Sequence, residues 1–190
     1  MKKLLTFLAL VLVCRLPVAA QIAPTPGPTP DPHIYDDRAI HLVVPTDYTL
    51  LGRRTVKVSQ LGGKLEPIAA WAKRTKRGDQ ITISLATEGD NERLGAWLVT
   101  FKNEAREQIQ NVFFKGTVRG KLKNGMPAYW VDLSYGTGFD SHKRYGWVWS
   151  DGQRGVFLSI DFPLGVMTPE QAQATLANVR ATLYPNPSEP

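Results

Sequence analysis

Cysteine and long apolar runs are what this 190-residue chain lacks most clearly. Cys14 is its only cysteine. The longest apolar run near the start, Leu4–Val13, is about half of the ~20 residues that a membrane-spanning helix needs. If Cys14 is removed with a leader peptide, the remaining chain can form no disulfide. It also has no thiolate for catalysis or metal binding.

Short catalytic motifs are also missing. The sequence contains no H-E-x-x-H, G-x-S-x-G, Walker or Rossmann glycine pattern, and only three histidines. Asp140-Ser141-His142 holds the residue types of a hydrolase triad. Three consecutive residues do not converge into the relay that nucleophile, base and orienting acid form, so a polar loop is the better interpretation. We predict no enzyme activity, cofactor or metal.

The N-terminus has the pattern of a secretory signal peptide. Lys2 and Lys3 precede the apolar run, and small residues at Val18-Ala19-Ala20 predict cleavage before Gln21. We therefore expect residues 1–20 to be a leader and the protein to be periplasmic or secreted. The alternative is a lipid anchor on Cys14, although no small residue precedes it as a lipidation signal requires.

Proline marks the segment that follows the leader. Residues 21–33 alternate proline with small polar residues and predict an extended linker. Residues 34–184 are long enough for one domain with its own core, since 43% of the whole chain is hydrophobic. Residues 185–190 form a short polar tail that we expect to be disordered.

Strand patterns occur in two groups. Residues 40–44 and 56–59 predict short strands, and residues 67–73 and 80–87 predict a hairpin that turns at Arg77-Gly78-Asp79. Asn124-Gly125 and Asp151-Gly152 suit two-residue hairpin turns. They predict a meander of four strands over 118–123, 128–135, 144–150 and 155–162.

Two amphipathic helices complete the pattern. The first is predicted from apolar residues spaced three and four apart, with Asp90 as its N-cap: Leu94, Trp97, Leu98, Phe101, Ala105, Ile109 and Val112. Thr168-Pro169-Glu170-Gln171 is a capping box that opens the second. We expect an α+β fold in which both helices pack on an antiparallel sheet.

The layout resembles the PsbP-like fold group. The resemblance rests on the Val44-Pro45 step, the hairpin and helix that follow, and Gly125-Met126-Pro127-Ala128-Tyr129-Trp130-Val131 at the opening of the meander. It implies an α/β/α sandwich. It also implies a binding or assembly protein rather than an enzyme, without supplying binding residues.

Basic residues gather in two places. Lys73, Arg74, Lys76 and Arg77 surround the first hairpin turn, and Lys115, Arg119, Lys121 and Lys123 lie along the predicted first strand of the meander. The first group is either an anion-binding site or a solvated hairpin tip. Lysines in the second group are typical of a protected edge strand.

Aromatic residues form a row in the meander. Tyr145, Trp147 and Trp149 alternate along one strand, and Trp130 lies on the strand before it. They are either a stacking platform for a ligand or part of the core. The core interpretation is favoured, because Trp97 and Phe101 of the first helix need a surface to pack on.

Three further polar residues have two interpretations each. Asp132 and Asp161 are either a half-buried acidic pair with shifted pKa values or solvent-facing acids, and the second is favoured. His41 alternates with Ile40 and Leu42 and is expected to be a surface or locally bonded histidine, since zinc needs three or four ligands.

These features favour an exported, non-enzymatic protein that binds or scaffolds an unknown protein or polymer of the cell envelope. An anion-binding module and an unrecognised hydrolase are the alternatives. Nucleic acid is not an expected partner of an exported chain, and no transmembrane helix is expected after cleavage.

Overall fold

A computed structural model describes residues 31–37, 40–53, 65–89, 93–122, 125–150 and 154–181. The predicted leader, the predicted strand at 56–59, Asp90 and the C-terminal tail lie outside these residues.

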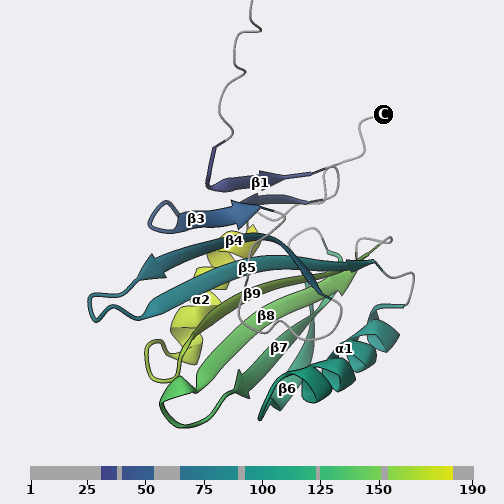
Figure 1. Ribbon diagram of the computed structural model, residues 1–190. Helices are drawn as coiled ribbons and strands as arrows, with labels where there is room; N and C mark the ends of the chain where they lie inside the picture. The colour runs from purple at the N-terminus through teal and green to yellow at the C-terminus, as the bar shows by residue number, and fades with distance from the viewer. Residues whose placement is uncertain are drawn as a thin grey trace, which may run out of the picture.

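A seven-stranded antiparallel sheet forms the centre of the molecule (Figure 1). Its strand order is β3-β4-β5-β9-β8-β7-β6. The strands are β3 (Thr49–Arg53), β4 (Glu66–Arg74), β5 (Gln80–Gly89), β6 (Phe113–Lys121), β7 (Pro127–Tyr135), β8 (His142–Ser150) and β9 (Arg154–Pro163). The predicted hairpin and meander are confirmed, and β9 joins them by pairing with β5.

A small second sheet lies beside β3 in Figure 1. It pairs β1 (Ile34–Asp36) with β2 (His41–Val43), which falls within the strand predicted at 40–44. Side chains of the large sheet hold it in place: Arg53 of β3 donates to the Ile34 carbonyl of β1 at 2.6 Å, and two further contacts reach the residues that flank β1. The Trp71 indole donates to the Pro32 carbonyl at 2.7 Å, and Arg154 pairs with Asp37 at 2.8 Å. Sequence patterns did not reveal β1 or β3, because short edge strands carry little periodicity.

The two helices cover opposite faces of the large sheet. Side chains of α2 (Pro169–Ala181) pack in one core with Leu158 and Ile160 of β9. Side chains of α1 (Leu94–Gln108) pack in a second core with Phe157 of β9. Neighbouring residues of a strand point to opposite faces, so the sheet lies between the helices. The α+β class and the packing of a helix on each face are confirmed.

The helix ends agree with the sequence at α2 and differ at α1. The capping box of α2 forms as predicted: Thr168 Oγ1 accepts from the Gln171 amide at 3.2 Å, and Gln171 Oε1 accepts from the Thr168 amide at 2.9 Å. The N-cap of α1 is Arg93, which makes no side-chain cap, so the Asp90 prediction is wrong. The helix stops at Gln108, and Val112 packs on its core from the following segment.

Gly146 tests how closely the sheet and its covering side chains are packed. A Cβ at this position would overlap the Phe157 ring and lie 2.6 Å from the Leu158 carbonyl oxygen. We expect Gly146→Ala to lower the free energy of unfolding by about 1–3 kcal/mol, as overpacking does. Urea unfolding measures it. Gly95→Ala in α1 is the control, because its Cβ meets nothing within 4 Å; equal effects of the two changes would contradict the prediction.

Candidate functional site

Three connections meet at one end of the large sheet, at the left of Figure 1. They are the β4–β5 turn, the β7–β8 loop with the short helix η1 (Gly138–Asp140), and the β9–α2 connection. Between them is an open hollow of about 680 Å³, here named the loop-end hollow. It is lined by Thr75, Lys76, Arg77, Asp79, Phe139, Pro163, Leu164, Gly165 and Val166.

The turn and loops around this hollow are braced by backbone hydrogen bonds. The Thr75 amide donates to the Asp79 carbonyl at 2.8 Å, and Gly78 supplies the positive φ of +90° that the turn needs. The Leu164 amide donates to the Ser141 carbonyl at 2.8 Å, which joins the β9–α2 connection to the loop that carries η1. The side chains around the hollow are therefore carried by backbone segments that hydrogen bonds hold in place.

The predicted basic group is divided by the structure. Lys76 and Arg77 are exposed and line the loop-end hollow. Lys73 and Arg74 line a second hollow of about 550 Å³ beside β3. There Lys73 pairs with Asp47 at 3.0 Å and lies over the Tyr48 ring.

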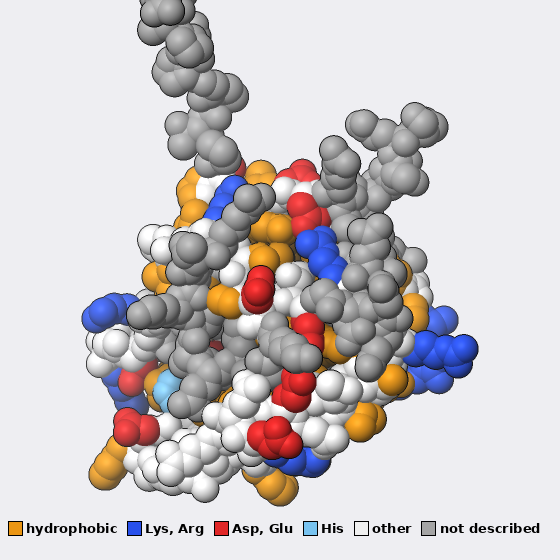
Figure 2. Space-filling view, turned by 45° about the vertical axis from the view of Figure 1, so that its right-hand side comes forward, with side chains coloured by type: hydrophobic (Ala, Val, Ile, Leu, Met, Phe, Trp, Pro, Cys, Tyr) orange, Lys and Arg blue, Asp and Glu red, His pale blue; other side chains and the backbone are white. Residues whose placement is uncertain are grey.

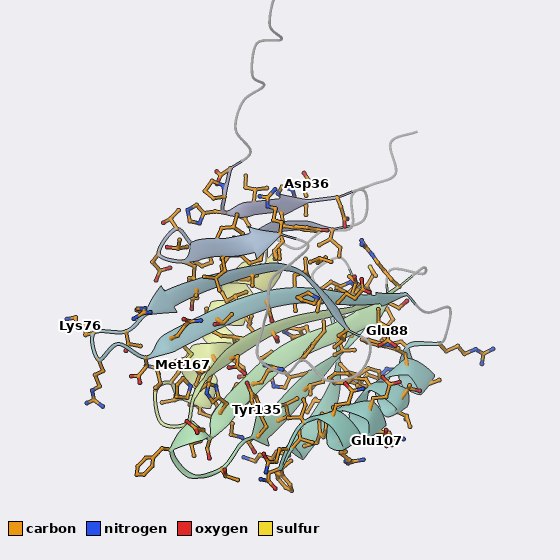
Figure 3. The ribbon with its side chains drawn as sticks, in the orientation of Figure 1. Asp36, Lys76, Glu88, Glu107, Tyr135 and Met167 are labelled. Carbon is orange, nitrogen blue, oxygen red and sulfur yellow. The ribbon has the colours of Figure 1, made fainter. Side chains whose placement is uncertain are left out.

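Figures 2 and 3 show how this end of the molecule presents its charge. Lys76 points outward from the β4–β5 turn in Figure 3. Lys and Arg side chains also project at the left margin of Figure 2, on the side of that turn.

The second basic group lies on the sheet edge, as predicted. Lys115, Arg119 and Lys121 belong to β6, the last strand in the sheet order. Lys123 lies outside the described residues. These cations protect an unpaired strand edge.

A buried polar network lies behind the loop-end hollow. Asp161 of β9 accepts hydrogen bonds from Tyr135 at 2.6 Å and from Arg144 Nε at 3.0 Å through Oδ2. Its Oδ1 lies 2.8 Å from His142 Nδ1. Arg144 is 0% exposed and also donates to the Tyr135 hydroxyl at 3.1 Å. Four side chains from three neighbouring strands thus satisfy one another.

The network sets opposite pKa shifts on its acid and its base. Burial raises the pKa of Asp161, but the Arg144 charge and the hydrogen bonds from His142 and Tyr135 outweigh burial and hold this pKa below 3.8. The hydrogen bond to Asp161 is the main reason that the pKa of His142 lies above 6.5, against the opposing effects of partial burial and Arg144. Both shifts favour the charged pair.

Sequence reasoning missed this network and misjudged its members. Asp161 is buried rather than solvent-facing, and Asp132 is not its partner. Asp132 pairs in register with Tyr145 and binds Lys143 at 2.9 Å, on the opposite face. His142 approaches Asp161 rather than Asp140 of the triad-like run. The available signal was that His142 and Arg144 alternate along one strand, so they share a face.

The aromatic row is packed in the core beneath α2. Trp130, Tyr145 and Trp149 are buried, and Trp147 packs against them partly exposed. Trp130 stacks on Tyr145 with ring centroids 5.8 Å apart. The structure therefore supplies no open stacking platform at these four residues.

His41 is half-buried and lies 3.1 Å from Asp36 of β1, which agrees with a locally bonded histidine. Within the described residues, no cluster of three or more His, Cys, Asp or Glu side chains is placed to hold a metal ion. None of the helices in this part of the chain is both long and apolar enough to cross a membrane.

Removing the charge of Asp161 tests how much the network contributes to the free energy of unfolding. We expect Asp161→Asn to lower the free energy of unfolding by about 3–5 kcal/mol, because it leaves the buried Arg144 cation without its counter-ion. Asp132→Asn is the matched control. It breaks a more accessible ion pair and is expected to cost about 1 kcal/mol or less. Chemical unfolding compares the two variants, and equal costs would contradict a structural role for Asp161.

His142 gives a pH dependence of known sign. Its pKa is raised on folding, so its stabilisation is present below pH 6.5 and is lost as the pH rises through the folded-state value. Asp161 affects stability at low pH. Its pKa is lowered on folding, so its stabilisation is lost as the pH falls below 3.8.

We therefore expect wild-type protein to lose more stability than His142→Gln between about pH 5.5 and pH 8. Urea unfolding at both pH values measures this difference. Parallel stability curves for the two proteins would argue against a charged His142–Asp161 pair.

Comparisons with known proteins identify no family for this chain. No family model matches it, and no curated protein matches it. Among solved structures, LpqN of Mycobacterium tuberculosis, described as involved in cell envelope biogenesis, covers 80% of this chain and 88% of its own at 17% identity and a TM-score of 0.46. A likeness at this level carries no argument about function, and the PsbP-like resemblance is not confirmed.

Proposed function

We propose that this chain is an exported, non-enzymatic binding protein of the cell envelope and that it binds its partner at the loop-end hollow. One observation carries the proposal. Exposed cations, Lys76 and Arg77, share an open hollow with the exposed apolar residues Phe139 and Leu164. Such a mixture of charged and apolar side chains in a concave surface is typical of binding sites.

Export is supported by the sequence of the first twenty residues. A dibasic start, a short apolar run and small residues before Gln21 form the pattern that signal peptidases recognise. The proline-rich residues that follow suit a spacer between the cleavage site and the first strand. The partner is an envelope protein or polymer, and a lipid anchor on Cys14 is the alternative form of attachment.

A non-catalytic role is supported by the state of the polar side chains. Asp161, His142, Arg144 and Tyr135 have the chemistry of an active site, yet they are bonded to one another. Their groups therefore stabilise the sheet. A broad hydrolase screen tests the alternative, and turnover that His142→Gln abolishes would overturn the proposal.

The second candidate function is an anion-binding module. Lys76 and Arg77 are absent from the ion pairs formed within the described residues, so their charge is available to an anionic partner. Arg74, in the neighbouring hollow, is also exposed. Asp79 also lines the loop-end hollow and accepts a hydrogen bond from Thr75 at 3.2 Å. An anion would therefore approach from the side of the two cations.

Polyanion binding tests this candidate. We expect the protein to be retained on a heparin matrix and to elute as salt rises towards ~1 M, where the screening length falls to about 3 Å. The Lys76→Ser/Arg77→Ser variant should elute at lower salt than wild type. Lys115→Ser/Arg119→Ser on β6 is the matched control, with the same change in net charge at another surface. Equal elution of the two variants would show that net charge alone governs retention.

A further inference from the structure

Two of the exposed large hydrophobic side chains of the molecule lie at the end of the sheet that carries the loop-end hollow, here called the loop end. Phe139 is fully exposed on η1, and Leu164 is 62% exposed just after β9. Single exposed apolar residues are common on protein surfaces. These two differ because they line the same hollow and are carried by loops that the Leu164–Ser141 hydrogen bond ties together.

Two cations line the hollow together with Phe139 and Leu164. They are Lys76 and Arg77 of the β4–β5 turn. Figure 3 shows Lys76 directed away from the sheet, on the side where Met167 of the β9–α2 connection lies. Asp79, the acidic residue that lines the same hollow, is bonded to Thr75 within its turn, and Asp140 follows Phe139 in η1.

The arrangement matches an anionic lipid bilayer better than a flat protein surface. Its apolar groups stand on separate loops around a hollow instead of forming one continuous patch. Separate apolar side chains can insert among the acyl chains of a bilayer, while Lys and Arg side chains remain at the level of the lipid phosphates. Cations near an anionic leaflet strengthen binding about fivefold each, which supplies the charge complementarity.

We propose that the loop end docks on an anionic bilayer surface. Phe139 and Leu164 enter the interface, and Lys76 and Arg77 contact the lipid phosphates. This proposal rests on the anion-binding role proposed above and adds to it an apolar component that a soluble polyanion does not use.

Vesicle sedimentation tests the docking. The protein from the exported fraction is mixed with vesicles of equal parts phosphatidylglycerol and phosphatidylcholine, and with vesicles of phosphatidylcholine alone. We expect binding to the anionic vesicles and about tenfold weaker binding by Phe139→Ser/Leu164→Ser, since burial of the two side chains is lost. Both residues are exposed, so the variant is expected to fold normally.

The matched control is Val99→Ser/Val118→Ser. These two side chains are 59% and 64% exposed, Val99 on the first half of α1 and Val118 on β6 opposite Trp130, and neither lines the loop-end hollow. The control should bind vesicles as wild type does. The loop-end variant should also keep wild-type elution from heparin, which separates loss of the apolar contacts from loss of anion binding.

Every other outcome contradicts the docking proposal, the anion-binding proposal or both. Retention on heparin without vesicle binding, equal loss in both apolar variants, or equal binding to neutral vesicles overturns the docking and leaves the anion-binding role intact. A dimer in sedimentation velocity that Phe139→Ser dissociates also overturns it, because a second copy would then cover this face. Binding to neither heparin nor vesicles overturns both proposals.

Discussion

Burial of the central strand on both faces is the constraint on which this structure depends. Every residue of β9 from Gly155 to Phe162 is buried. An antiparallel strand can leave one face in water, but this one requires a cover on each side. Helix α2 covers the Leu158 face, and α1 covers the other with Trp97 seated on Gly155, where a Cβ would overlap its ring. The antiparallel order of the strands places the β4–β5 turn, the β7–β8 loop and the β9–α2 connection at the same end of this sheet.

The same constraint explains why the polar residues that resemble an active site are bonded to one another. Asp161 lies on the buried strand, and an isolated carboxylate there would be very costly. Arg144 is its register partner on β8, and Tyr135 and His142 complete its hydrogen bonds. The cations Lys76 and Arg77 and the apolar side chains of Phe139 and Leu164, in contrast, reach solvent at the end of the sheet.

Local patterns predicted a large part of the fold. Period-two alternation and turn dipeptides located the hairpins, and the capping box placed the start of α2 where it is found. They failed where little local signal exists. The short strands β1 and β3 were not predicted, and the contact that joins them comes from segments distant in the chain: Arg53 of β3 donates to the Ile34 carbonyl of β1 at 2.6 Å. The boundary of α1 moved because packing, rather than a capping residue, fixes its first turn.

By itself the sequence determined the α+β class and the basic character of the first hairpin, and it holds the chain's only cysteine within a segment that has the pattern of an export leader. These properties depend on residues close together in the chain. Only the tertiary structure decided that β5 pairs with β9, that Asp161 meets Arg144, and that Lys76 and Phe139 line one hollow with Leu164. Such contacts join segments far apart in sequence. Their selection depends on burying both faces of one sheet together, which no local pattern records.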